Sequence, residues 1–152
     1  MVVLRIWNSA KHGGGGWGHS SLEVGGAPPA GVYISWWPGD LKGTLPAFAE
    51  NNSFAQDLRL EGQPSATFRL DGLDERAIKI WWMRWRGSST MYLWEGKNCS
   101  STVAKALQAG GSDGFAKNAG WKTPAMWTPS VLSDYARAIR AGQEAKNRMA
   151  TS

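Results

Sequence analysis

The chain is poor in the residues from which disulfides and metal centres are built. Its 152 residues include one cysteine and two histidines, which excludes an internal disulfide and argues against a structural zinc site of cysteines and histidines. No segment reaches the roughly 18 consecutive apolar residues that a membrane helix needs. The start, Met1 to Trp7, lacks the basic region and long apolar stretch of a signal peptide. We expect no metal, no cofactor, no membrane anchor, and synthesis in the cytoplasm without a signal peptide.

Charge is also sparse. Charged residues make up 19% of the chain and the net charge is +5, with an isoelectric point of about 9.6. No run of lysine or arginine concentrates this charge, so a nucleic-acid partner is not expected. A mildly basic surface suits an anionic lipid or cell-wall polymer as well as it suits ordinary solubility. What the chain does have is ten tryptophans, which either fill the core or line a cleft for sugars or apolar groups.

Length and patterning predict one α+β domain over residues 1–142, followed by a flexible tail over residues 143–152. Residues 38–63 are mixed and polar, which favours a loop that covers the site. The strands expected from β-branched, apolar or alternating runs are 2–7, 17–24, 32–37, 65–70 and a short one at 91–94. The helices expected from capping residues and helical spacing are 74–85, 98–109 and 128 to about 141.

Two of these strands form a predicted hairpin whose turn lies in the glycine- and proline-rich segment 25–31. A hairpin centred on Ala27 pairs residues whose numbers sum to 54, so that His19 lies opposite Ser35. Strand alternation then gathers polar and aromatic side chains on one face. These residues are Trp17, His19, Ser21, Glu23, Tyr33, Ser35 and Trp37.

Cys99 directly follows Asn98, a favoured helix N-cap residue. The exposed N–H groups and the dipole of a helix N-terminus favour the thiolate over the thiol, and the thiolate is the reactive form. The backbone N–H of Cys99 can also donate to an oxyanion formed during attack on a carbonyl. The alternative is that Cys99 is a small buried apolar residue with no chemical role.

A cysteine nucleophile needs a base, and the base needs a group that orients its ring. We predict that His19 is the base and that Ser35, opposite it in the hairpin, accepts the ring N–H. His12, in a glycine-rich loop, is the rival base. Glu23 is the rival orienting group, but four residues along an extended strand place it roughly 13 Å from His19.

The motifs around these residues resemble the circularly permuted branch of the NlpC/P60 papain-like superfamily, which includes lecithin:retinol acyltransferase-like proteins and bacterial amidases. The segments that carry the resemblance are Gly18–Leu22, Tyr33–Pro38 and Asn98–Ser101. The resemblance implies an antiparallel sheet packed against helices, with the cysteine helix abutting the sheet. It also implies attack of the thiol on an amide or ester and hydrolysis of the acyl-enzyme. Ser35 falls on the third catalytic position, where the family often has histidine or another polar residue.

Small basic relatives of this kind resemble antibacterial effectors of type VI secretion systems. By this analogy, the chain is a cysteine amidase or endopeptidase that cleaves peptide bonds of peptidoglycan in the periplasm of a target cell, with an immunity protein as a second partner. The residues expected to bind substrate are Trp17, Tyr33, Trp37 and Asn98. The alternatives are a thiol-dependent lipid acyltransferase or phospholipase, a protein deamidase or protease, and a binding module without catalysis.

Overall fold

The computed structural model describes residues 1–8, 18–36, 53–86 and 98–152. Within them the chain forms one antiparallel sheet and several helices, which agrees with the α+β prediction. The strands are β1 (Val2–Trp7), β2 (His19–Val24), β3 (Val32–Ile34) and β4 (Ala66–Leu70), in the order β3-β2-β1-β4. The helices are α1 (Phe54–Glu61), α2 (Glu75–Arg86), α3 (Cys99–Ala109), α4 (Ser112–Asn118) and α5 (Pro129–Thr151).

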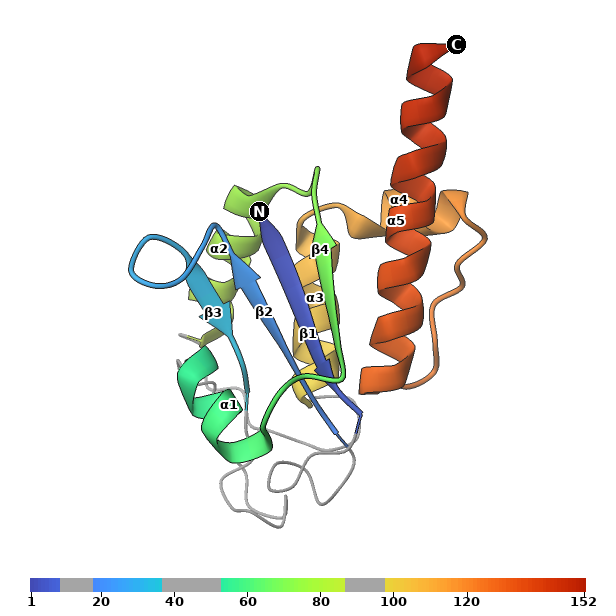
Figure 1. Ribbon diagram of the computed structural model, residues 1–152. Helices are drawn as coiled ribbons and strands as arrows, with labels where there is room; N and C mark the ends of the chain where they lie inside the picture. The colour runs from blue at the N-terminus through green and yellow to red at the C-terminus, as the bar shows by residue number, and fades with distance from the viewer. Residues whose placement is uncertain (9–17, 37–52, 87–97) are drawn as a thin grey trace.

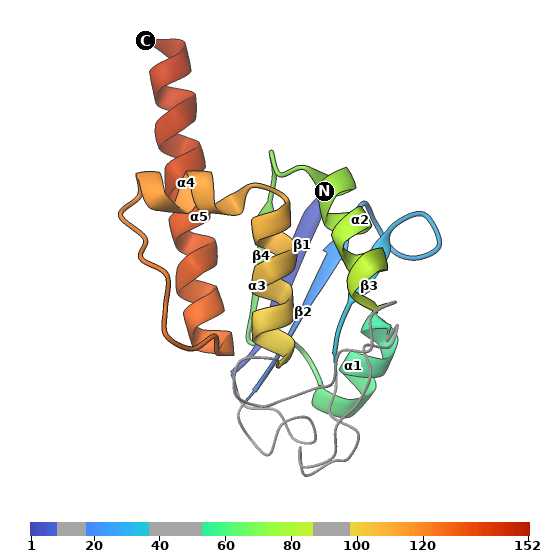
Figure 2. The ribbon, with the colours of Figure 1, turned by 180° about the vertical axis from the view of Figure 1, so that it is seen from behind.

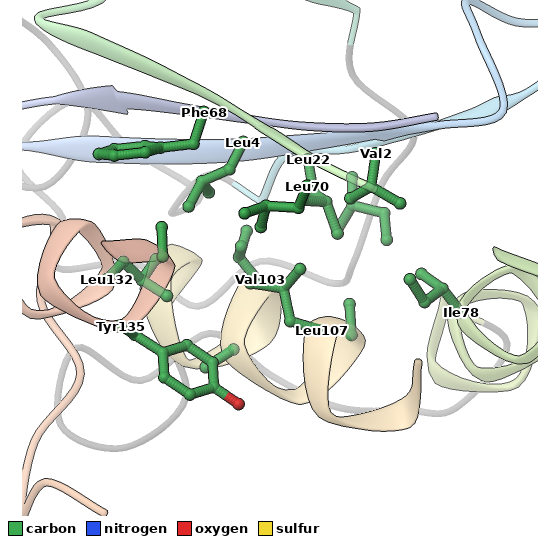
Figure 3. Close-up of a cluster of buried hydrophobic side chains, with 14 of the residues drawn as sticks. Val2, Leu4, Leu22, Phe68, Leu70, Ile78, Val103, Leu107, Leu132 and Tyr135 are labelled. Carbon is green, nitrogen blue, oxygen red and sulfur yellow. The ribbon is translucent and has the colours of Figure 1, made fainter. Parts of the chain in front are cut away.

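Helices α2, α3 and α5 cover one face of the sheet (Figures 1 and 2). The strands point a row of apolar side chains toward these helices, where Val103 and Leu107 of α3 meet them (Figure 3). The strand residues of this core include Leu4, Leu22 and Leu70, none of which is exposed to solvent. Burial of such side chains contributes about 1.5–3 kcal/mol each to folding, so this layer fixes the position of α3 against the sheet.

The opposite face of the sheet is more polar, because side chains alternate along each strand. Here α1 approaches the sheet: the Phe54 ring lies 3.8 Å from the Arg5 guanidinium carbon, and Arg5 also pairs with Glu23 at 3.3 Å. The two fully or nearly buried side chains of α1 are acidic, Asp57 and Glu61. Helix α1 is therefore held to the sheet by polar contacts as well as by packing.

The hairpin of β2 and β3 forms as predicted, but in a different register. Leu22 lies opposite Ile34 and Val24 opposite Val32, so paired residue numbers sum to 56 and the expected sum of 54 is wrong. The centre of the hairpin therefore lies at Pro28, one residue later than expected, in a loop whose Pro28–Pro29 peptide bond is cis. A shift of two keeps every side chain on its predicted face, since the period of a strand is two.

Three other expectations about secondary structure need correction or fall outside the described residues. Residues 38–63 were expected to be loop, yet 54–61 form α1. The last helix was expected to end near Ala141, with a tail beyond, yet α5 continues to Thr151. Its second half contains three alanines together with Glu144, Lys146 and Arg148, all of them strong helix formers. It has no continuous apolar stripe by which the sequence would reveal a helix. The strand expected at 91–94 lies outside the described residues.

The contact between α4 and α5 depends on the absence of a side chain at Gly142. A Cβ atom built there would lie 1.9 Å from the backbone oxygen of Phe115. We expect Gly142→Ala to lower the free energy of unfolding by about 1–3 kcal/mol, because the two helices must move apart. Urea denaturation of the variant measures this. Gly114→Ala is the matched control, since its Cβ meets nothing within 4 Å, and equal stability of the two variants would contradict the prediction.

Candidate active site

Cys99 begins α3, and the helix start is built as the sequence predicts. The Asn98 side chain accepts a hydrogen bond from the Ser101 backbone N–H at 2.8 Å, and the Ser101 hydroxyl closes the capping box from the other side. The Asn98 amide also donates to the Trp127 carbonyl at 3.3 Å. The structure thus places Asn98 as a cap that aims Cys99, and its role in substrate binding stays a prediction. The Cys99 side chain is buried, with 7% exposed.

His19 is the first residue of β2, at the end of the sheet beside the start of α3. Its Nε2 atom lies 3.0 Å from the Ser35 hydroxyl, so the structure confirms the expected contact between these two side chains. The Trp7 ring lies against the imidazole, with 5.3 Å between ring centroids. Trp7 is in turn held by a hydrogen bond from its indole N–H to the Gly62 carbonyl at 2.9 Å. The imidazole therefore has a fixed orientation.

Asp57 is the site residue that the sequence analysis missed. It lies in the first turn of α1, is fully buried, and places Oδ2 3.3 Å from His19 Nε2. The Ser35 hydroxyl donates to the same oxygen at 2.8 Å, so Ser35 bridges the imidazole and the carboxylate. Burial alone would raise the pKa of Asp57, but hydrogen bonds and charge from His19, with Tyr33 and Ser35, lower it. Asp57 is therefore an ionised orienting group, and Ser35 is its intermediary.

The sequence does contain a signal for α1, the helix that carries Asp57. Ser53 and Gln56 match the Ser-x-x-Gln pattern that marks a helix start, and the Ser53 side chain does accept a hydrogen bond from the Gln56 N–H. That pattern places Asp57 in the first helical turn. The hydrophobic periodicity that normally supports such a helix is missing because its inward side chains are polar.

Tyr33 supports the carboxylate from the neighbouring strand. Its hydroxyl lies 2.6 Å from Asp57 Oδ2 and 2.7 Å from the Ser21 hydroxyl. A hydroxyl has one proton, so donation to Asp57 leaves the Tyr33 oxygen to accept from Ser21. Burial first, and then the adjacent carboxylate, raise the pKa of Tyr33 far above its usual value, which keeps it a neutral donor. Only 1% of Tyr33 is exposed, so the structure places its hydroxyl on the carboxylate, and its role in binding substrate stays a prediction.

The remaining candidates fall into two groups. Trp17, Trp37 and the rival base His12 lie outside the described residues. Glu23, the rival orienting group, is instead paired with Arg5 at 3.3 Å. Asp57, not Glu23, supplies the carboxylate.

The electrostatics of Cys99 and His19 are those of an ion pair. Burial would lower the pKa of His19, but hydrogen bonds to Asp57 and Cys99, together with their negative charge, raise it to about 9. Burial would raise the pKa of the Cys99 thiol, but the hydrogen bond and charge of His19 lower it, with help from the Ser20 backbone and the Ser100 hydroxyl. Because Nε2 faces Ser35 and Asp57, Nδ1 is the ring nitrogen left to meet the sulfur. His19 is thus hydrogen-bonded to Ser35 and Asp57 and coupled electrostatically to Cys99.

Comparison with known proteins finds that part of the chain is similar to segments of two bacterial toxins. It is 37% identical over 75 residues to a multifunctional-autoprocessing repeats-in-toxin protein of Vibrio cholerae serotype O1, and equally similar to one of Vibrio vulnificus. The match covers 49% of this chain but only 2% and 1% of those toxins. No solved structure matches the chain.

These matches do not bear on the resemblance to the NlpC/P60 superfamily, which stays a prediction. Among the described residues, no helix is long and apolar enough to cross a membrane. In the same part of the chain, no group of three or more His, Cys, Asp or Glu side chains is arranged to hold a metal ion.

Residues 42–152, nearly three quarters of the sequence and including Asp57 and Cys99, match the family model described as the IcsB middle domain. The chain therefore belongs to the IcsB middle-domain family.

Proposed function

We propose that this chain is a thiol enzyme that works through an S-acyl intermediate on Cys99. The observation that carries the proposal is the buried His19–Asp57 pair, hydrogen-bonded at 3.3 Å and coupled to Cys99 at the N-terminus of a capped helix. A nucleophile, a base and a group that orients the base are the three parts that such catalysis requires. The same geometry supports a papain-like arrangement of the fold, which we include in the proposal.

The reaction follows from the charges of the site. The Cys99 thiolate attacks a carbonyl carbon, and the carbonyl oxygen becomes an oxyanion that the N-terminal backbone N–H groups of α3 can stabilise. His19, as imidazolium, gives its proton to the leaving amine, alcohol or thiol as the bond to the carbonyl carbon breaks. The products are a Cys99 thioester and the protonated leaving group. His19, now neutral, accepts a proton from the incoming acceptor, which attacks the thioester and restores the thiolate.

Peptidoglycan is the first candidate substrate. The resemblance to bacterial amidases and the basic net charge of +5 favour cleavage of a peptide bond in an anionic cell wall, by an effector that is delivered to a target periplasm and neutralised in its producer by an immunity protein. The similarity to toxin segments supports an effector role in a coarser sense. In this candidate the acceptor is water.

The burial of Cys99 favours a second candidate, transfer of the acyl group to an acceptor other than water. Only 7% of the side chain is exposed, and His19 and Asp57 are exposed by 2% or less. A site that excludes bulk water protects a reactive thioester from hydrolysis until a bound amine or alcohol reaches it. Acyltransferases in the superfamily that the motifs resemble make this chemistry a natural alternative, with a lipid or another acyl thioester as the donor.

One experiment tests the proposal and separates the candidates. The protein is incubated with short-chain and long-chain acyl-coenzyme A or with purified sacculi, and Cys99→Ala is the control. Intact-protein mass spectrometry should find an acyl adduct on Cys99 that hydroxylamine removes, and chromatography should reveal any released muropeptides. Muropeptide release that depends on Cys99 supports the amidase, whereas a long-lived adduct that transfers to an added amine supports the acyltransferase. Wild-type protein that neither forms an adduct nor releases muropeptides would contradict the thiol-enzyme proposal.

A further inference from the structure

One serine hydroxyl lies next to the Cys99 sulfur and a second contacts the first, and neither belongs to the group of Cys99, His19 and Asp57. The Ser100 hydroxyl lies 3.9 Å from the sulfur, and 3.1 Å from the hydroxyl of Ser20. Ser100 belongs to the first turn of α3, while Ser20 belongs to β2 and is 80 residues away in sequence. Both side chains are essentially inaccessible, with 1% and 0% exposed. The pair therefore links the nucleophile helix to the strand that carries His19.

The backbone of the same strand also acts on the thiol. The Ser20 backbone helps to lower the pKa of Cys99, and His19, the preceding residue, has its side chain on the other face of β2. His19 and Ser20 are the first two residues of β2, and their side chains point to opposite faces of the strand. The start of β2 therefore brings both residues to the site. Any movement of β2 relative to α3 would change both contacts.

The number of protons in the serine pair restricts how it can be arranged. Each hydroxyl has one proton, and one of the two must donate to the other across the 3.1 Å contact. If Ser20 donates to Ser100, the Ser100 proton is left to point at the sulfur. If Ser100 donates to Ser20, an oxygen lone pair faces the sulfur instead. The first arrangement suits a thiolate, and the second suits a thiol, which has a proton to donate.

We propose that Ser100 and Ser20 form a two-hydroxyl relay that donates a hydrogen bond to the Cys99 thiolate and reverses its direction when the sulfur is protonated. The proposal rests on the proposed role of Cys99 as nucleophile. It makes Ser100 a positioning residue, which acts through the sulfur, and makes Ser20 the group that orients the Ser100 proton. Hydrogen bonds to an ionised group are roughly twice as strong as those between neutral groups, so the relay stabilises the reactive form selectively.

The relay predicts graded effects on the ionisation of Cys99. Ser100→Ala removes the direct donor, and we expect the pH midpoint for ionisation of Cys99 to rise by about one unit, which is a roughly tenfold change in proton affinity. Ser20→Ala leaves the Ser100 proton and the Ser20 backbone N–H in place, so its midpoint should rise by a smaller amount. The measurement is the thiolate absorbance near 240 nm against pH, referenced to Cys99→Ala, together with the rate of alkylation by iodoacetamide.

Thr102→Val is the matched control. It removes a hydroxyl from the same helical turn without changing its branched shape, and the Thr102 hydroxyl donates to the Asn98 carbonyl at 2.9 Å. Its ionisation midpoint should equal that of the wild type. If Ser100→Ala is folded, as judged by circular dichroism, and also titrates like the wild type, the relay is wrong. If wild-type Cys99 itself titrates near the ordinary value of about 8.5, the proposed function fails instead, so the two failures are distinguishable.

Discussion

Asp57→Asn should lower the rate of Cys99 acylation by roughly four orders of magnitude, the effect expected when a carboxylate that orients a catalytic histidine is replaced by an amide. The substitution preserves size and burial, but its amide can donate a hydrogen bond to His19 Nε2. This would place the imidazole proton on Nδ1, the nitrogen that faces the sulfur, and the imidazole could no longer accept a proton from Cys99. Single-turnover measurement of the acyl adduct by mass spectrometry gives the rate.

Ser35→Ala is the matched control for this prediction. Ser35 bridges His19 and Asp57, with contacts of 3.0 Å and 2.8 Å, but Asp57 remains within 3.3 Å of the imidazole without it. We therefore expect a modest loss of rate and no change in folding. A loss as severe as that of Asp57→Asn would show that Ser35 is the principal orienting group, as the sequence analysis proposed.

The His19 imidazole should titrate with a pKa of about 9, against 6.5 for an ordinary histidine. NMR titration of the ring protons measures this directly, and His12→Ala identifies which of the two histidine signals belongs to His19. The rate of acylation should fall as pH rises through about 9, because neutral His19 has no proton for the leaving group. In Asp57→Asn the His19 pKa should drop toward or below 6.5, since a favourable charge is lost and burial remains.

The pKa shifts of His19 and Cys99 also make the free energy of unfolding depend on pH, and the two contributions have opposite signs. The His19 pKa is raised on folding, so its contribution to the free energy of unfolding is complete below pH 6.5 and is lost as pH rises through about 9. The Cys99 pKa is lowered, so its contribution is present above the usual thiol pKa and is lost as pH falls through the folded value. The two slopes oppose each other near neutral pH, and for that reason the ring titration is the cleaner measurement. A His19 pKa near 6.5 in the wild type would contradict the ion pair.

The sequence predicts the cysteine half of the site well because its signals are local. The ends of α3 are predicted to within one residue. The signals are Asn98 as the N-cap before Cys99 and the glycines that follow the helix. The contact between His19 and Ser35 was also expected, although the register used to derive it was two residues off. Strand alternation is robust to that error, since it depends only on whether the shift is even.

The other half of the site, Asp57 on α1, could not be predicted from the sequence in the same way. Helices are recognised by an apolar stripe, and the buried stripe of α1 carries Asp57 and Glu61. Asp57 is buried because His19, Tyr33 and Ser35 surround its carboxylate, and these contacts exist only in the folded tertiary structure. Helix α4 was missed for a simpler reason: it has seven residues and contains a glycine.

The register of the hairpin has a consequence for how the family can vary. The loop between β2 and β3 lies far from the thiol in sequence and in space, and Gly26 within it has open room around it. A change of two residues in the pairing keeps Tyr33 and Ser35 on the face of the sheet that α1 covers, but it moves them roughly 7 Å along the strand, out of hydrogen-bond reach of Asp57. An odd change turns Tyr33 and Ser35 toward the apolar core and leaves Asp57 buried without its donors. Length variation in this loop should therefore be tolerated where the loop absorbs it and the pairing of β2 with β3 is kept.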